Sequence, residues 1–501
     1  MSKILIGWAE ETLVPDKKIA LAGQFFLRVS EYVESEITAT AMAVEADNEQ
    51  MIMISSDLPS MPFYLQDLIR EEFAKICPDV DPKKIILSVT HTHTSHTLDD
   101  PNAKEAGAFS TTKTLLDEFV PEENRYVNNI EIDDSVLPST EAAIFVSKQI
   151  AAAAKRAWEN RAEAYYTNEF GRAAVGMCRR VHYSDGTSKM WGDTNTATFE
   201  CMEGGNDSGI ELIYTFDKDK NLTGVVANIA CPAQILEQRS FISADYWGRA
   251  KANIREKLGE NVHLLGLCGA AGDQCPRDLV RWVDPETPID DPNVKRPNPS
   301  NKKADPSMYD ISGCNRVGKR IANEIVSVYE EIDFADIKDE AIFKHKVIDL
   351  ELPLRRATTT EYETAIREIE LYVSKNKHKG RFTFEDSANL HIHLGTIARY
   401  RMQEDVNLIP MESHIVRLGD VAFTTNPFEL FLDYGNVIKA RSKASQTFIL
   451  QLTNGWYGYL PTEKAEKAGH YSAYISSGKV GHVGGDMYVR HALNEINKMF
   501  E

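Results

Sequence analysis

A strand–helix–strand unit near the N-terminus is the feature that most limits how this chain can fold. Residues 51–57 (MIMISSD) and 84–90 (KIILSVT) are apolar, β-rich runs that end in polar residues. Residues 64–77 between them follow the amphipathic period of a helix. A crossover of this length allows the two strands to pair in parallel, which is typical of α/β proteins.

The same alternation continues to the C-terminus, although 501 residues would allow about three domains. It predicts one α/β domain over residues 1–501, with mixed β-sheets flanked by helices. The further elements that we expect are helices at 139–161, 246–258, 358–377 and 385–404 and strands at 210–216, 224–229, 262–267, 414–418, 421–425 and 447–452.

One segment, residues 281–310, interrupts the alternation. It is crowded with Pro, Asp and Asn, so it is neither a helix nor a central strand. The alternation resumes after it, which favours a lid or loop over a domain linker. Because it begins shortly after Pro276, we expect it to cover a cleft formed by strand ends that carry His91, Cys275 and Glu429.

Charge and composition exclude several classes of function. The chain has 56 Lys and Arg against 75 Asp and Glu, a net charge of −19, which argues against binding to nucleic acid or to an anionic membrane. The short apolar N-terminal run fits neither a signal peptide nor a membrane anchor. Seven Cys without a CxxC pair predict reduced thiols. We expect a cytoplasmic protein that acts on small molecules, with a homo-oligomer as one option.

The histidine-rich segment THTHTSH at residues 90–96 is the sharpest local motif. Ligand sites in α/β sheets gather beyond the carboxyl ends of strands, and this segment follows a strand directly. Alternate residues of an extended chain point the same way, so His91 and His93 can reach one point, a usual start for a zinc site. The alternative is a polar loop whose histidines bind backbone groups.

Three further motifs carry candidate chemistry. In GLCGAAGDQCP at residues 266–276, glycines allow a backbone cradle for an oxyanion, and Cys275 is either a nucleophile or a small packed side chain. Glu429, in TNPFE, suits a metal ligand, a general base or a helix N-cap. The aromatic turn NGWYGYLP at residues 454–461 is followed by Tyr471.

In this order, the motifs resemble the catalytic N-terminal domain of the neutral/alkaline (non-lysosomal) ceramidase family, with this chain as a divergent intracellular member. The resemblance covers essentially the whole chain. The segments that carry it are GWAE at 7–10, QFFLR at 24–28, SSD at 55–57, THTH at 90–93, CRR at 178–180, NIACPAQ at 228–234, SAD at 243–245, GAAGDQCP at 269–276, NPFE at 426–429 and NGWYGYLP at 454–461.

The resemblance implies a zinc-dependent amide hydrolase. It implies zinc ligands at His91, Glu429 and Tyr459, with His93 as a proton carrier beside the metal. Zinc would lower the pKa of bound water to about 7 and polarise the substrate carbonyl. Arg179 and Tyr471 match positions that hold the substrate and the developing oxyanion. The remaining candidates are Cys275 and Asp245 for catalysis and Arg180, Gln234, Asp273, Gln274 and Tyr457 for substrate binding.

Two positions depart from the family pattern. Pro232 stands where the family has its second zinc-binding histidine, and proline cannot ligate a metal. Cys231 or Gln234 as a substitute, a metal with oxygen ligands, or no metal are the alternatives. Cys275 replaces the family's serine, either as a hydrogen-bonding group or as a nucleophile.

The substrate is also expected to differ. Ceramidases act on a membrane lipid outside the cell and commonly add a C-terminal immunoglobulin-like domain. From this sequence we expect neither an export signal nor such an additional domain. We therefore expect hydrolysis of an amide or ester bond in a small polar, water-soluble substrate. The alternatives are a metal-free carbohydrate-active enzyme using His93, Glu429 and Asp245, or a binding protein that kept the cleft but lost the metal.

Overall fold

A computed structural model describes residues 2–24, 26–103, 110–127, 130, 132–280 and 310–501. The predicted lid at 281–310 lies outside the described residues except for Asp310, with which helix α5 begins. None of the helices in the described part of the chain is long and apolar enough to cross a membrane.

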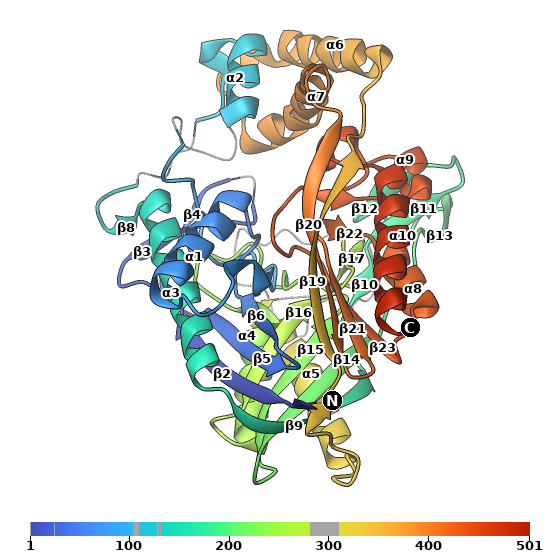
Figure 1. Cartoon of the computed structure of the whole chain (residues 1–501). Coiled ribbons are helices and arrows are strands. Elements are labelled where there is room, and N and C mark those ends of the chain that lie inside the picture. The colour runs from blue at the N-terminus through green and yellow to red at the C-terminus, as the bar shows by residue number, and fades with distance from the viewer. Residues whose placement is uncertain (1, 25, 104–109, 128–129, 131, 281–309) are drawn as a thin grey trace.

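The centre of the fold is a mixed eight-stranded sheet of order β16-β15-β14-β9-β2-β5-β6-β7 (Figure 1). Its outer pairs β6–β7 and β15–β16 are parallel, and helices α1 and α4 cross over between them, as the sequence pattern predicts. The strands are β2 (Leu5–Thr12), β5 (Thr38–Ala46), β6 (Glu49–Ser56), β7 (Ile85–Val89), β9 (Ala162–Arg172), β14 (Gly209–Asp217), β15 (Leu222–Ile229) and β16 (His263–Cys268).

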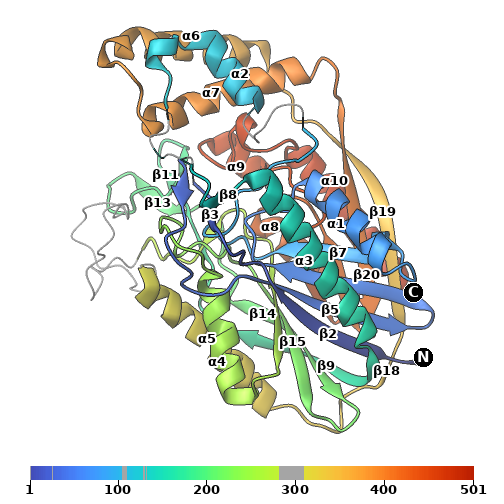
Figure 2. The same ribbon diagram turned by 90° about the vertical axis from the view of Figure 1, so that its left-hand side faces the viewer.

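Helices cover one face of this sheet (Figure 2). Alternate residues of each strand point to opposite faces, and Ala41 of β5 packs against one pair of helices while Leu212 of β14 packs against another. The first pair is α1 (Phe63–Ile76) and α3 (Ser139–Glu159), and the second is α4 (Asp245–Leu258) and α5 (Asp310–Glu330).

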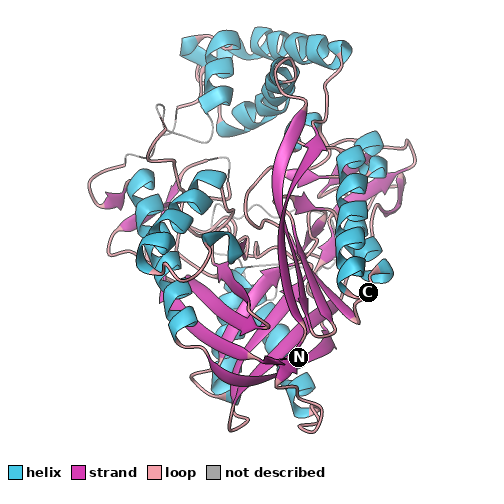
Figure 3. Cartoon of the chain, in the orientation of Figure 1, coloured by secondary structure: helices cyan, strands magenta, loops and turns pink. Residues whose placement is uncertain are grey.

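A four-stranded sheet covers the other face. Met42 of β5 and Ile213 of β14 belong to the same buried cluster as Phe423 and Phe448 of this second sheet. Two further helices cover its outer side, which gives four layers, helix–sheet–sheet–helix (Figure 3). The elements are β19 (Phe343–Pro353), β20 (Leu408–Leu418), β21 (Val421–Thr425), β23 (Gln446–Leu450), α8 (Leu432–Arg441) and α10 (His482–Met499).

A small helical cap rises from the ends of β19 and β20 (Figure 1). It has its own apolar core, which includes Ile369 and Leu394. Thr358 and Thr383 form capping boxes at the starts of the two longer helices, which agree with the predicted helices at 358–377 and 385–404 to within two residues at each end. The cap consists of α2 (Ser110–Phe119), α6 (Thr359–Asn376) and α7 (Phe384–Met402).

Short elements complete the chain and shape the edge that carries the candidate site. They are β1 (Ser2–Lys3), β3 (Lys18–Leu21), β4 (Arg28–Val29), β8 (Val136–Leu137), β10 (Met177–Cys178), β11 (Arg180–Tyr183), β12 (Ser188–Met190), β13 (Phe199–Met202), β17 (Gln274–Cys275), β18 (Glu340–Ala341), β22 (Glu429–Leu430), β24 (Tyr459–Leu460) and α9 (Glu463–Ala468).

Candidate active site

The candidate site lies where the carboxyl ends of strands from both sheets meet. The segments after β7, β15 and β16 are joined by backbone hydrogen bonds, from Ala233 N–H to Thr90 O (3.2 Å) and from Gly269 N–H to Ile229 O (2.7 Å). Gly272 N–H donates to Leu430 O (2.8 Å), which brings in the segment after β21. The parallel strand pairs thus place four separate motifs at one edge.

The two histidines of the THTH segment face one another here. His93 Nε2 lies 3.4 Å from His91 Nε2, with the two rings edge to face. His91 Nδ1 binds the carbonyl of Pro59, and its Nε2 lies 3.6 Å from Glu429 Oε2. His91 has φ +64°, the left-handed region that side chains rarely adopt and that often marks functional positions. The structure therefore brings His91, His93 and Glu429 together.

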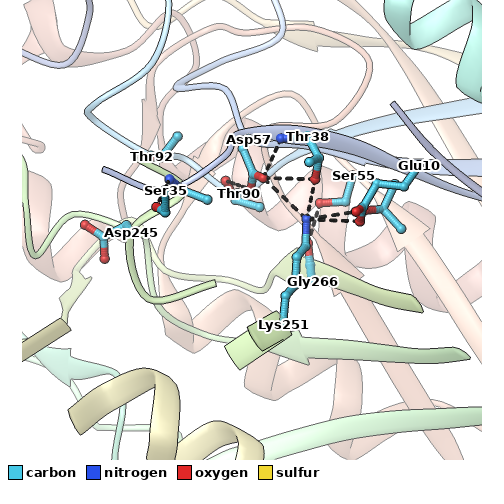
Figure 4. A network of polar contacts seen from close by, with 12 residues as sticks. Glu10, Ser35, Thr38, Ser55, Asp57, Thr90, Thr92, Asp245, Lys251 and Gly266 are labelled. Carbon is cyan, nitrogen blue, oxygen red and sulfur yellow. Dashed lines mark hydrogen bonds and ion pairs between the residues drawn. The ribbon is translucent and has the colours of Figure 1, made fainter. Parts of the chain in front are cut away.

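A buried polar network fixes the start of the THTH segment (Figure 4). Thr90 Oγ1 donates to Asp57 Oδ1 (3.1 Å), while Asp57 Oδ2 accepts from Thr38 N–H (2.9 Å) and faces Lys251 Nζ at 3.4 Å. Lys251 also donates to Thr38 Oγ1 (2.5 Å) and lies 3.6 Å from Glu10 Oε2. This network holds the backbone that carries His91 in its strained conformation.

Glu429 and Tyr459 are aligned by their backbones. Strands β22 and β24 pair in parallel with Glu429 opposite Tyr459, so the two side chains lie at one level. Burial alone would raise the pKa of Glu429, but the nearby side chains of His91 and Arg179 outweigh burial and lower the pKa. Burial and the Glu429 carboxylate raise the pKa of Tyr459 well above its usual value, so the phenol keeps its proton.

Close packing behind Glu429 requires a glycine. A Cβ on Gly272 would lie 2.3 Å from the carbonyl oxygen of Glu429, closer than real Cβ contacts allow. The glycine-rich motif at residues 266–276 thus presses against the backbone of Glu429 instead of opening a wide cradle.

Arg179 is a buried cation that joins three of these segments. Its Nη1 donates to Gln234 Oε1 (3.1 Å), and its Nη2 donates to Gly272 O (3.0 Å) and to Tyr459 Oη (3.3 Å). The ring of Tyr471 meets that of Tyr459 edge to face, 5.5 Å apart. Arg179, Tyr459 and Tyr471 thus form a donor-rich wall of the site, next to Glu429.

Glu237, Arg277 and Trp191 also belong to the site, and sequence reasoning missed them. His93 Nδ1 lies 3.5 Å from Glu237 Oε2, whose other oxygen lies 3.5 Å from Arg277 Nη2. The guanidinium carbon of Arg277 lies over the ring of Trp191, 4.6 Å from its centre. Glu237 and Arg277 directly follow the strand-end motifs at 228–234 and 269–276, which is the signal that could have identified them.

The surroundings of His93 keep its ring neutral. Burial, the neighbouring His91 ring, and the guanidiniums of Arg28 and Arg179 lower the pKa of His93 well below its usual range. Its Nδ1 is buried and has no hydrogen bond that meets normal geometry. A neutral imidazole carries a lone pair on one ring nitrogen, so it can accept a proton.

Cys275 is a packed thiol. It is fully buried, its Sγ donates to Arg277 O (3.4 Å), and Arg277 N–H donates back to the sulfur (3.3 Å). Burial raises the pKa of Cys275 to about 12, although Arg179 lowers it slightly. The thiol is therefore protonated at neutral pH, which does not support the nucleophile interpretation.

Comparison with solved structures places this geometry in context. A neutral ceramidase from Pseudomonas aeruginosa superimposes with a TM-score of 0.64 at 12% identity, and the match covers 100% of this chain and 75% of that one. The chain has the fold of a neutral ceramidase. A ceramidase complexed with C2 matches with a TM-score of 0.65 at 11% identity, over 100% of this chain and 76% of that one. No protein-family model and no curated protein matches the sequence.

The ceramidase resemblance read from the motifs is thus confirmed at the level of the fold, but the zinc site that it implies does not fit. The resemblance puts Pro232 at the position of one ligand, and proline cannot ligate a metal. Neither proposed substitute is available, because Cys231 Sγ is buried and bound to the carbonyls of Val175 and Pro232, and Gln234 Oε1 accepts from Arg179. Over the described ranges, no group of three or more His, Cys, Asp or Glu side chains could hold a metal.

Arg180 and Tyr457, predicted to bind substrate, serve the protein itself. Arg180 is fully buried and pairs with Glu203 (2.5 and 3.0 Å) while donating to the carbonyl of Tyr471 (2.9 Å). It therefore braces the loop that carries Tyr471. Tyr457 donates to Pro410 O (2.8 Å) and packs its ring on Phe63, at the rim of the site.

Three more predicted site residues bind backbone groups instead of facing the site. Asp273 accepts from Leu432 N–H (2.9 Å) at the start of α8, and Gln274 donates to Gly205 O (3.1 Å). Asp245 accepts from the backbone N–H groups of Leu236 (2.8 Å) and Tyr246 (2.7 Å) at the start of α4, and Figure 4 shows it apart from the Asp57 network. These hydrogen bonds hold the carboxylate at the start of α4, while burial raises the pKa of Asp245 to about 7, and its acid–base role stays a prediction.

Proposed function

We propose that this protein is a hydrolase that cleaves an amide or ester bond in a small polar substrate, with His93 as the general base. The observation that carries the proposal is the pairing of a neutral, weakly held His93 with the donor wall of Arg179, Tyr459 and Tyr471 in one site. A base beside donors for a developing oxyanion is the arrangement that acyl hydrolysis needs. The neutral ceramidase fold supports the same reaction class.

The hydrogen-bond pattern sets the direction of proton transfer. The Glu237 carboxylate favours a proton on His93 Nδ1, which leaves a lone pair on Nε2. The carbonyl of Pro59 likewise holds the proton of His91 on Nδ1. Three acceptors then lie around His91: its own Nε2 lone pair, the Nε2 lone pair of His93 at 3.4 Å and the Glu429 carboxylate at 3.6 Å. Such a group of acceptors binds and orients a donor such as the reacting water.

In the proposed reaction, water attacks the substrate carbonyl carbon while His93 Nε2 takes one of its protons. The negative charge that develops on the carbonyl oxygen is stabilised by Arg179 and by the phenol protons of Tyr459 and Tyr471. Glu237 stabilises the imidazolium of His93. His93 then returns the proton to the leaving nitrogen or oxygen as the acyl bond breaks.

The carbohydrate alternative receives less support. It required Asp245 and Glu429 as a carboxylate pair, but Asp245 is committed to the backbone of α4. A binding protein with a preserved site makes a clear experimental distinction, because it would bind the same amides without releasing an amine.

The test is a hydrolysis assay on the purified full chain. A panel of N-acyl amines and matched esters is incubated with the wild type and with the Tyr459→Phe, Arg179→Lys and His482→Gln variants, and the released amine or alcohol is quantified. His482→Gln is the control, because His482, at the start of α10, pairs with Glu466 of α9. We expect turnover by the wild type and the control and losses of about 10²-fold or more in the two site variants.

Two results would count against the proposal. Equal turnover by Tyr459→Phe, Arg179→Lys and the wild type would remove the oxyanion site. Binding of panel members without any release by the wild type would favour the binding-protein alternative.

A further inference from the structure

Three arginines and two glutamates lie around the candidate site. The guanidiniums of Arg28, Arg179 and Arg277 are near the carboxylates of Glu237 and Glu429. His93, the histidine beside them, is held neutral by burial and by the cations of Arg28 and Arg179. The three arginines differ in how far the protein uses their hydrogen-bond donors.

Two of the three arginines make several hydrogen bonds to the protein. Arg28 donates to the carbonyls of His93 (2.7 Å) and Arg239 (2.6 Å), which ties the THTH segment to the chain after β15. Arg179 donates to Gln234, Gly272 and Tyr459. Much of their hydrogen-bonding capacity is therefore used in shaping the site.

Arg277 differs from these two. In the part of the chain that the structure describes, the polar contact of its guanidinium is the 3.5 Å approach to Glu237, which is longer than a good hydrogen bond. The backbone N–H and carbonyl of Arg277 both form hydrogen bonds with the sulfur of Cys275, and its guanidinium lies over the ring of Trp191. The backbone N–H of Trp191 donates to Arg179 O (2.8 Å), which fixes the position of Trp191.

Among the described residues, this geometry leaves most N–H donors of the guanidinium without an acceptor. The ring of Trp191 lies at cation–π distance and attracts the positive charge, but it does not replace the planar donors that an anion would bind. The Arg277 side chain is 12% exposed, so an anion that reaches it would be largely shielded from water. A fixed, poorly paired guanidinium beside a base is suited to bind one end of a substrate.

We infer, building on the proposed hydrolase function, that Arg277 binds a carboxylate of the substrate and that the substrates are N-acyl amino acids. A carboxylate matches the planar donors of arginine, and within the described ranges the 3.5 Å approach to Glu237 leaves most of these donors unused. Only Glu237 separates Arg277 from His93, with 3.5 Å on each side. The acid and the scissile bond are therefore a few bonds apart, as they are in an N-acyl amino acid.

The test compares ligands that differ in one charge. The probes are a panel of N-acyl amino acids, such as N-butanoylglycine, and the corresponding neutral primary amides, such as N-butanoylglycinamide. Their affinities are measured by calorimetric titration on the full-length wild type and on the Arg277→Gln, Arg277→Lys and Arg172→Gln variants. Arg172 is the matched control, because its guanidinium also lies over an aromatic ring, that of Phe170.

We expect the wild type and Arg172→Gln to bind at least one acid about 10- to 100-fold more tightly than its amide. Arg277→Gln should lose this preference, and Arg277→Lys should keep part of it. The preference of the wild type should also decrease as the salt concentration rises.

The inference is overturned if no acid in the panel binds more tightly than its amide, or if Arg277→Gln keeps the full preference with an unchanged melting temperature. Amine release, measured on the same samples, separates this inference from the proposed function. Preferred binding of the acids without release would contradict only the hydrolase proposal, and equal hydrolysis of acids and amides would contradict only the role of Arg277.

Discussion

The chain contains two pairs of buried histidines that use their ring nitrogens in opposite ways. In the site pair, His91 and His93, the two Nε2 atoms face each other at 3.4 Å and His93 Nδ1 has no good hydrogen bond. In the second pair, His345 on β19 and His414 on β20, Nε2 of one ring lies 2.8 Å from Nδ1 of the other. The first pair thus has a buried ring nitrogen without a good hydrogen bond, whereas every ring nitrogen of the second pair has a polar partner within 3.0 Å.

The second pair continues into a chain of short hydrogen bonds between the sheets. His345 Nδ1 lies 3.0 Å from Gln50 O, and His414 Nε2 lies 2.7 Å from Glu412 Oε1. Glu412 is held by both Nη atoms of Arg70, at 2.6 and 3.0 Å. The pair therefore joins the second sheet to β6 and α1 of the first half of the chain.

The difference teaches how to separate structural from reactive histidines in one fold. Burial lowers the pKa of all three rings with a resolved shift, His93, His345 and His414, so burial does not distinguish them. Within these two pairs, the satisfaction of the ring nitrogens does distinguish them. A buried nitrogen without a partner costs stability, and such a cost is retained at sites where the nitrogen acts on a ligand.

The largest expected effect is on turnover. His93→Gln keeps a polar side chain but removes the base, so we expect hydrolysis to fall by about 10³-fold while the melting temperature stays close to that of the wild type. Steady-state kinetics and thermal unfolding on the same preparation measure both. A strong loss of stability in this variant would make the site pair structural and would break the comparison.

The complementary change is His414→Leu. It leaves His345 Nε2 without its buried partner and removes one of the two contacts of Glu412 Oε1, so the free energy of unfolding should fall by about 2–4 kcal/mol. Turnover of the folded fraction should remain unchanged. Urea unfolding with parallel kinetics checks this, and lost turnover in fully folded protein would contradict the structural assignment.

The second pair also predicts a dependence of stability on pH. Burial alone would raise the pKa of Glu412, but the hydrogen bonds from His414 and Arg70 lower it to about 2, from an ordinary value of 4.5. The stability contributed by the ionised carboxylate is therefore complete above 4.5 and is lost as the pH falls toward 2.

We expect Glu412→Gln to lose less stability than the wild type on acidification, by up to about 3 kcal/mol over the full range. Urea unfolding at a series of acidic pH values measures the two slopes. Parallel slopes would show that Glu412 does not titrate abnormally.

A smaller effect is expected at Cys275. Since its thiol is protonated and binds only the backbone of Arg277, Cys275→Ser should keep turnover within about threefold of the wild type. Iodoacetamide should label Cys275 slowly in the folded protein. Inactivation in step with labelling of this residue would restore the nucleophile interpretation.

The smallest expected effect concerns metal removal. Elemental analysis of the untagged protein should find well below one zinc per chain, and dialysis against a chelator should leave turnover unchanged, because Pro232 removes one of four ligands. One tightly held zinc that is lost in His91→Ala would mean that the metal binds the ring nitrogens of the site pair, His91 and His93. The contrast between the two pairs would then disappear.

Much of the fold could be predicted from the sequence because its strands are long and strongly apolar. The two parallel pairs at the sheet edges, and with them the position of His91 beyond a strand end, follow from that pattern. Four long strands, β2, β5, β9 and β19, were not predicted. Strands β9 and β19 lack clear alternation, since they are half exposed and mix charged with apolar residues.

The site was predictable only in part, for a physical reason. A carboxylate at a turn suits a helix start as well as a catalytic acid, and sequence cannot tell which N–H groups lie nearby. Asp245 and Asp273 became acceptors at helix starts, while Glu429, for which an N-cap was an alternative, faces His91. Glu237 and Arg277 emerge only when three distant segments are brought together.

The in-register pairing of β22 with β24 has a consequence for how this chain can be recombined. Glu429 and Tyr459 come from segments that are separated in sequence but aligned by direct backbone pairing. A chimera of two homologous proteins with a crossover between these strands would take β22 from one parent and β24 from the other, so the alignment of Glu429 with Tyr459 would no longer come from a single parent. Engineered hybrids should therefore inherit residues 426–461 as one block, and crossovers belong outside it, where exchange leaves the mutual alignment of the carboxylate and the phenol intact.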